Sequence, residues 1–178
     1  FGIDQGVFAE RGFDLRVRTI FGGAAIAAAF DSGEIGMGSL GSPSGLVPLS
    51  RGARFKVVES GCRQRARMYL GVRRSLRDYD ALRGARIGIL SLGSCPAWII
   101  ESMLRHHGLD PRRDVELVPL GEAYPHVVDL IAEGAIDACL ATEPNLSIGE
   151  HRDVLDVWAV ASDPPFLPDF QWIVRVAN

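Results

Sequence analysis

The sequence predicts an α/β fold in which mostly parallel sheets are flanked by helices. Strand-like apolar runs and helical segments alternate along the whole chain, a pattern typical of such sheets. Glycine follows five predicted helices, as left-handed C-caps require, at positions 12, 33, 52, 108 and 134. Proline opens four predicted helices, where its missing N–H would have no partner, at positions 43, 96, 125 and 144.

In the first half of the chain, alternation of apolar and polar residues predicts strands, and helical spacing predicts helices. The segment 13–20 is predicted as a strand because apolar residues alternate with Arg16 and Arg18. The alanine-rich stretch AAIAAAF at 24–30 is predicted as a helix. The remaining predicted helices are 3–11, 43–51 and 79–83, and the remaining strands are 34–38, 55–60, 68–72 and 85–90.

The second half repeats the same alternation. Its predicted helices are 96–107, 125–133 and 144–150, and its strands are 115–118, 136–141, 154–160 and 171–176. Apolar residues that recur at helical spacing are assigned to the core: Phe8, Ile26, Phe30, Ile99, Met103, Val128 and Ile131.

Composition narrows the class of protein. The 178 residues fit one domain or two small lobes, and 47% apolar against 23% charged residues provide a buried core. A net charge of −3 argues against nonspecific nucleic-acid binding. No apolar run approaches the roughly 20 residues that a membrane-spanning helix needs. The cysteines, Cys62, Cys95 and Cys139, allow one disulfide with a spare thiol or three free thiols.

The motif Ser-Leu-Gly-Ser occurs twice, in IGMGSLGSPSG at 35–45 and in IGILSLGSCPAW at 87–98. Each copy follows a predicted strand and precedes a helix that proline opens. Such turns lie at the carboxyl ends of strands, where unpaired helix N–H groups attract anions or polar oxygens. Helix capping alone is the alternative. The candidate ligand-binding residues are Gly22, Gly23, Gly38, Ser39, Ser42, Ser91, Gly93, Ser94, Cys95, Tyr124 and Glu143.

We assign no catalytic residue. Cys95 is the candidate nucleophile because a helix N-terminus lowers the pKa of a thiol. His126 is the histidine best placed to face the same region, but the sequence places no base beside Cys95. No spacing of histidine and cysteine resembles a metal motif, so no metal site is expected. No cofactor is expected either.

Five phrases are spread between residues 6 and 144: GVFAERGFDLRV at 6–17, IAAAFDSGEIGMGS at 26–39, RGARFKVV at 51–58, LRGARIGILSLGS at 82–94 and LIAEGAIDACLATEP at 130–144. In this order they resemble the type II solute-binding proteins of ABC importers. The resemblance is to the branch that binds nitrate, alkanesulfonates, taurine and thiamine-pyrimidine precursors.

The resemblance implies two lobes with a ligand cleft between them. Lobe one is expected to contain 1–76 with 163–178, and lobe two 77–162. Strands 68–72 and 171–176 are expected to run side by side near the place where the chain crosses between the lobes. The hinge is expected near 74–78 and 161–166. Members of the family have a strand before the first helix and further helices at the C-terminal end. We therefore expect the native protein to be longer at both ends.

The function implied by the resemblance is solute capture without catalysis. A small polar or anionic organic ligand is expected to bind between the lobes and to be delivered to an ABC transporter permease. The expected location is the periplasm, or the outer face of the membrane as a lipoprotein, with membrane contact only through a lipid anchor or the permease. The alternative is a cytoplasmic enzyme on the same lobes, similar to a pyrimidine synthase or a cysteine-dependent desulfinase.

Overall fold

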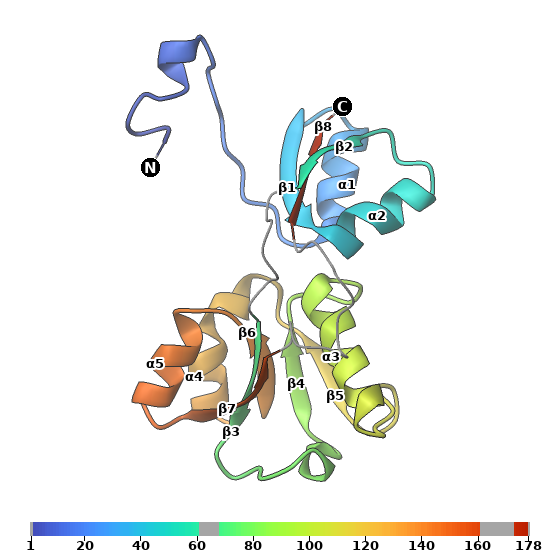
Figure 1. Cartoon of the computed structure of the whole chain (residues 1–178), viewed down its shortest axis with the longest axis vertical. Coiled ribbons are helices and arrows are strands. Elements are labelled where there is room, and N and C mark those ends of the chain that lie inside the picture. The colour runs from blue at the N-terminus through green and yellow to red at the C-terminus, as the bar shows by residue number, and fades with distance from the viewer. Residues whose placement is uncertain (1, 61–67, 161–172, 178) are drawn as a thin grey trace.

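The computed structural model describes residues 2–60, 68–160 and 173–177, which contain two separate sheets with helices packed against them (Figure 1). Each sheet and its helices form one lobe. The chain passes from the first sheet to the second between Ser60 and Tyr69, and returns between Val160 and Ile173. Within these described ranges, no helix is both long and apolar enough to cross a membrane.

The first lobe contains a three-stranded sheet of order β1-β8-β2, in which β8 runs antiparallel to both neighbours. Its strands are β1 (Met37–Gly41), β2 (Lys56–Ser60) and β8 (Ile173–Ala177). Helices α1 (Gly23–Asp31) and α2 (Ser42–Ser50) pack on this sheet and on each other. The core of this lobe is small and centres on Phe30 and Phe55, whose ring centroids are 5.0 Å apart.

The second lobe contains a five-stranded sheet of order β5-β4-β6-β3-β7. Strand β4 is parallel to β5 and β6, whereas β3 is antiparallel to β6 and β7. The strands are β3 (Tyr69–Arg73), β4 (Arg86–Ile89), β5 (Glu116–Pro119), β6 (Ala138–Ala141) and β7 (Leu155–Val160). The α-helices are α3 (Cys95–His106), α4 (Val127–Ala132) and α5 (Asn145–His151). Short 3-10 helices are η1 (Ala9–Arg11), η2 (Asp80–Leu82) and η3 (Gly121–His126).

Two buried clusters lie on the two faces of the second sheet. Helix α3 covers one face with Ile99, Ile100, Met103 and Leu104. Helices α4 and α5 cover the other (Figure 1), where Val127, Val128, Ile131 and Leu146 are buried. Burial of a side chain of this size contributes about 1.5–3 kcal/mol. The second sheet is therefore held from both sides and forms a rigid base for the loops at the ends of its strands.

Most predicted elements are present, but the N-terminal ones differ. The predicted helix 3–11 is reduced to turns and the three-residue helix η1, which Gly12 ends in the left-handed conformation. The predicted strand 13–20 is not a strand, and most of its side chains are exposed. Alternating apolar residues make a strand only where a neighbouring strand supplies hydrogen bonds. No described strand lies beside this segment, which extends away from both sheets (Figure 1).

The predicted pairing of strands 68–72 and 171–176 is wrong. Strand β3 pairs with β6 and β7 in the second sheet, while β8 pairs with β1 and β2 in the first. The apolar run at 68–72 suits a strand buried on both faces, which only the larger sheet provides. As a result, strand β3, which the predicted lobe boundary assigned to lobe one, belongs to the second sheet.

The predicted hinge at 74–78 is also wrong. Arg74 forms ion pairs with Asp153 and Asp156, and Leu76 is buried in the core of the second lobe. This segment lies at the end of the lobe remote from the first sheet (Figure 1). The other predicted hinge segment, 161–166, lies outside the described residues.

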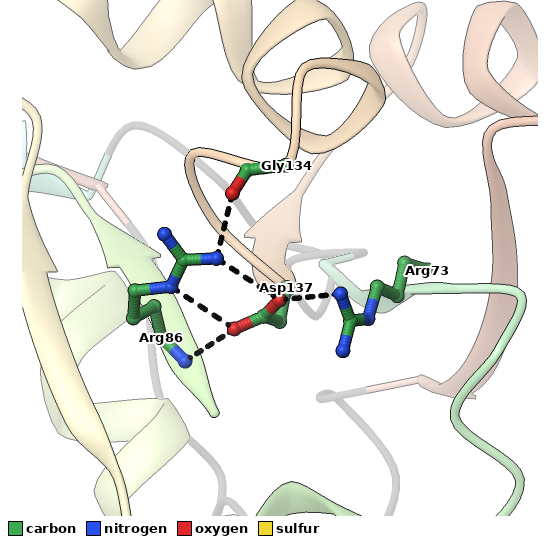
Figure 2. A network of polar contacts seen from close by, with 4 residues as sticks. All are labelled: Arg73, Arg86, Gly134 and Asp137. Atoms are coloured by element: carbon green, nitrogen blue, oxygen red, sulfur yellow. Dashed lines mark hydrogen bonds and ion pairs between the residues drawn. The ribbon is translucent and has the colours of Figure 1, made fainter. Parts of the chain in front are cut away.

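A buried carboxylate joins three strands of the second sheet (Figure 2). Asp137, which precedes β6, is 5% exposed. Its Oδ2 accepts hydrogen bonds from the backbone N–H of Arg86 at 2.8 Å and from Arg86 Nε at 3.3 Å. Its Oδ1 lies 3.1 Å from Nη1 of Arg73, at the end of β3. Arg86 also donates to the carbonyl of Gly134 at 2.6 Å. These bonds tie the start of β4 and the end of β3 to the segment that leads into β6.

The pKa of Asp137 follows from these contacts. Burial alone would raise it, but the Arg86 N–H, the Arg86 side chain and Arg73 together outweigh burial and lower it below the ordinary value of 3.8. A carboxylate with a lowered folded-state pKa stabilises the fold above its unfolded-state pKa. That stability is lost as the pH falls through the folded-state pKa.

We predict that Asp137→Asn lowers the free energy of unfolding by about 2–3 kcal/mol at pH 7, because two guanidinium groups lose their carboxylate. The loss is smaller than for a fully buried pair because both arginines are partly exposed and solvent screens their charges. Urea denaturation at pH 7 and at pH 3 measures the effect. The difference in free energy of unfolding between the variant and the natural protein should be smaller at pH 3. Asp14→Asn, in the exposed Arg16–Asp14 pair, is the control and should change stability little.

Candidate functional site

The N-terminal ends of α1 and α2 meet at a close approach of two small residues. A Cβ atom added to Gly23 would lie only 2.9 Å from the Cα of Ser44, which is backbone and cannot turn aside. Only glycine therefore allows the first turn of α1 to lie against the first turn of α2. The two helix starts of the first lobe are thereby held together.

These helix starts lie next to the second lobe. A Cβ atom added to Gly22 would lie 3.4 Å from the Oγ of Ser91, which follows β4 in the second sheet. Helix α2 also contacts helix α3. The segments before α1 and α3, about 70 residues apart in sequence and in different lobes, are thus neighbours.

The second Ser-Leu-Gly-Ser copy forms a capping turn. Ser94 is 2% exposed, and its Oγ accepts the N–H of Ala97 and the N–H of Ser91, each at 3.4 Å. The N–H of Ser94 donates back to the Ser91 carbonyl at 3.1 Å. Leu92 is 72% exposed, and Gly93 has a φ of 75° with open space around it. Ser94 is therefore used by its own helix, whereas Ser91 and the Leu92–Gly93 backbone face outward.

The first copy has a different structure. Ser39, Leu40 and Gly41 are the last residues of β1, and Ser42 is the first residue of α2. Leu40 is 6% exposed and packs in the core, in contrast to Leu92. Ser39 is exposed, and Ser42 is buried. The same four residues thus end a strand in one lobe and form a turn in the other.

Three other predicted ligand residues are engaged in structural contacts. Gly38 lies beneath Phe30, whose ring would stand 3.1 Å from an added Cβ. The hydroxyl of Tyr124 donates to the carbonyl of Leu140, and burial, with the nearby thiols of Cys139 and Cys95, raises its pKa. The carboxylate of Glu143 accepts the N–H and the hydroxyl of Ser147, at 3.2 and 2.7 Å, and so caps α5.

The thiol of Cys95 has the properties of a core residue. It is 3% exposed and free, and burial raises its pKa to about 12. Desolvation therefore exceeds the lowering that a helix N-terminus was expected to provide. His126 is exposed at the end of η3. Among the described residues, no three histidine, cysteine, aspartate or glutamate side chains are grouped to hold a metal ion.

Sequence reasoning missed Ser44, which lies against Gly23. Nothing in the local pattern marks this serine, because its importance comes from the angle at which α1 and α2 approach. Gly22 and Ser91 are both among the candidate ligand residues, but no local pattern indicates that the two positions lie close together.

The comparisons with known proteins agree with this architecture. A model described as the NMT1-like family matches residues 1–153. The chain belongs to the NMT1-like family. The "Putative binding protein YtlA" of Bacillus subtilis (strain 168) is 24% identical over 153 residues, which is 84% of this chain and 46% of that protein. The chain thus spans about half the length of this curated relative.

Solved structures with bound ligands are similar to this NMT1-like chain. The alkanesulfonate-binding protein SsuA from Xanthomonas axonopodis pv. citri, bound to MOPS, matches with a TM-score of 0.79 and 19% identity, over 99% of this chain and 60% of that one. PhnD1 from Prochlorococcus marinus (MIT 9301), in complex with methylphosphonate, matches with a TM-score of 0.72 and 12% identity, over 98% and 68%. Identities this low show the shared fold, and they confirm the predicted α/β fold with two lobes. The sheets are mixed rather than mostly parallel, since the only parallel pairs among the described strands are those of β4 with β5 and β6.

We expect Gly23→Ala to destabilise the first lobe by about 1–3 kcal/mol, because the new methyl group overlaps the Ser44 backbone. Thermal unfolding followed by circular dichroism measures the loss. Gly36→Ala is the matched control because an added Cβ there meets nothing within 4 Å. Equal melting temperatures for the two variants would contradict the close approach.

The burial of Cys95 and Cys139 predicts that neither thiol reacts with Ellman's reagent at pH 8 in the folded chain, and that both react in 6 M guanidinium. Alkylation followed by peptide mass mapping assigns the reaction to each cysteine. Rapid labelling of Cys95 in the folded chain would show an accessible thiolate and would revive the enzymatic interpretation.

Proposed function

We propose that this NMT1-like chain is part of a solute-binding protein that captures a small polar or anionic organic molecule between its lobes for an ABC importer. One observation carries the proposal. Gly22, at the start of α1, lies beside Ser91 in the turn that precedes α3 of the second lobe, and helix α2 contacts α3. A ligand at this place can accept hydrogen bonds from both lobes at once.

The physical basis is the polarity of helix ends. The first-turn N–H groups of an α-helix have no partner within the helix, and the helix dipole adds positive potential there. The residues that cap α1 and α2 are Gly22 and Gly41, which have no side chain to accept a hydrogen bond. Helix α3 differs, because Ser94 caps it and leaves the Ser91 hydroxyl and the Gly93 backbone as the second lobe's contribution.

Of the predicted ligand residues, Gly22, Ser39, Ser91 and Gly93 are the ones that we propose to face the ligand. The other predicted residues support the site through packing, burial or capping. They are Gly23, Gly38, Ser42, Ser94, Cys95, Tyr124 and Glu143. Backbone and hydroxyl donors bind oxyanions well, and the related fold of SsuA and PhnD1 holds a sulfonate or a phosphonate in the named complexes.

The partner and the location follow from the same proposal. Binding proteins of importers deliver their ligand to a membrane permease, and the alkanesulfonate- and sulphonate-binding neighbours include one described as periplasmic. We therefore propose a permease partner and a location outside the cytoplasmic membrane. Closure of the two lobes on the ligand would shift an equilibrium between open and closed forms.

Isothermal titration calorimetry of the protein at its native length tests the proposal. The panel contains MOPS, taurine, methylphosphonate, nitrate, an aromatic carboxylate and a pyrimidine. We expect saturable one-to-one binding of at least one oxyanion. Heats no larger than those of dilution across the panel would contradict the proposal.

For the ligand with the highest affinity, we expect Ser91→Ala to weaken binding by about tenfold, the loss of one hydrogen bond to a charged group. The same titration measures it. Ser50→Ala is the control, because this exposed serine donates to the Val47 carbonyl at the far end of α2. Unchanged affinity in Ser91→Ala would remove Ser91 from the site.

A further inference from the structure

We propose that Phe21 of the first lobe and Leu92 of the second bind the non-polar part of the ligand, so that the site selects oxyanions attached to a hydrocarbon group. The inference rests on the proposed capture of a ligand between the lobes. It adds the two residues that distinguish an organic oxyanion from an inorganic one such as nitrate. The polar groups around Gly22 and Ser91 hold the oxyanion, and the two apolar side chains contact the rest of the molecule.

Both residues lie directly beside the place where the two lobes come close together. Phe21 precedes Gly22, and Leu92 follows Ser91. A Cβ atom added to Gly22 would lie 3.9 Å from the Cβ of Ser91, so a gap about the size of a methyl group separates the two residues. Consecutive Cα atoms are about 3.8 Å apart. Phe21 and Leu92 are thus one residue away from this gap, on opposite sides of it.

Both side chains are exposed. Phe21 is 42% exposed and Leu92 is 72% exposed, whereas Leu40, the leucine of the first Ser-Leu-Gly-Ser copy, is 6% exposed. A single exposed apolar residue is ordinary on a protein surface. These two, however, come from different lobes and flank the same gap. Because removal of apolar surface from water favours binding, a ligand that covers both side chains gains affinity from each lobe.

The turn that carries Leu92 is fixed and has open space beside it. The Oγ of Ser94 accepts the N–H groups of Ser91 and Ala97, each at 3.4 Å, and so holds the backbone of the turn. Gly93 has a φ of 75°, and a Cβ atom added there would meet no described atom within 4 Å. Leu92 is therefore presented to solvent from a fixed backbone, next to the Ser91 hydroxyl.

The expected selectivity follows from these two kinds of group. Backbone and hydroxyl donors bind the oxygens of any oxyanion. The apolar pair contributes only where the oxyanion carries a hydrocarbon group, since only that group has apolar surface to remove from water. A small hydrated anion such as nitrate gains nothing from Phe21 and Leu92. An organic sulfonate, phosphonate or carboxylate gains affinity as its hydrocarbon part lengthens.

Isothermal titration calorimetry with a homologous series, from methanesulfonate to pentanesulfonate, tests the inference on the protein at its native length. The sulfonate is the same throughout, so differences in affinity report the added methylene groups. We expect the affinity to rise about two- to fourfold for each methylene that contacts the pair. Equal affinities for methanesulfonate and pentanesulfonate would overturn the inference and leave solute capture in place.

Two variants assign the effect to the pair. Leu92→Ser and Phe21→Ser should each lower the ratio of pentanesulfonate affinity to methanesulfonate affinity by about threefold. Phe13→Ser is the matched control, because this phenylalanine is 60% exposed in the same N-terminal segment and is remote in sequence from Gly22. It should leave the ratio unchanged. Circular dichroism checks that all three variants are folded, and an unchanged ratio in either Leu92→Ser or Phe21→Ser would overturn the pair.

The outcomes separate this inference from the proposed function. Binding of nitrate without binding of any alkanesulfonate would support solute capture and overturn the apolar pair. No binding across the oxyanion panel and across the alkanesulfonate series would refute solute capture, and the apolar pair with it.

Discussion

The second lobe depends on a carboxylate that is taken out of water and then paired. Asp137 is 5% exposed and receives hydrogen bonds or an ion pair from Arg86 and Arg73. A charge in this position destabilises the fold unless it is paired. Once paired, it fixes the relative positions of β3, β4 and β6, which neighbour one another in the sheet. The turn at Ser91 lies at the opposite end of β4, so its position depends on how β4 is held.

Three side chains that the sequence marked as candidates for chemistry or binding are used within the second lobe. The cysteine at the start of α3 is buried, with a pKa of about 12. Tyr124 and Glu143 bond to their own lobe. Among the described residues, those shown near the other lobe include the Ser91 hydroxyl, Gly22 and helices α2 and α3. Such groups donate hydrogen bonds to oxyanions and polar oxygens. These donors are the reason that we propose ligand capture at this place.

The two Ser-Leu-Gly-Ser copies show how context changes the role of a motif. In the first lobe the leucine lies in the core because the motif continues a strand beside β8. In the second lobe the strand has already ended at Ile89, so the leucine is exposed and Ser94 caps α3. Local preferences allow both conformations, and the length of the preceding strand selects between them.

The sequence by itself determined most helices and strands, since apolar periodicity, glycine after helix ends and proline near helix starts are local signals. It also predicted the α/β fold shared with the similar solved structures, and it singled out Gly22 and Ser91 as candidate ligand residues. The tertiary structure alone decided that β3 belongs to the second sheet and that 13–20 is not a strand. It alone decided that Gly22 faces Ser91 and that Gly23 lies against Ser44. Strand partners and helix contacts join residues far apart in the chain, and no local pattern specifies the partner that a strand or helix face will meet.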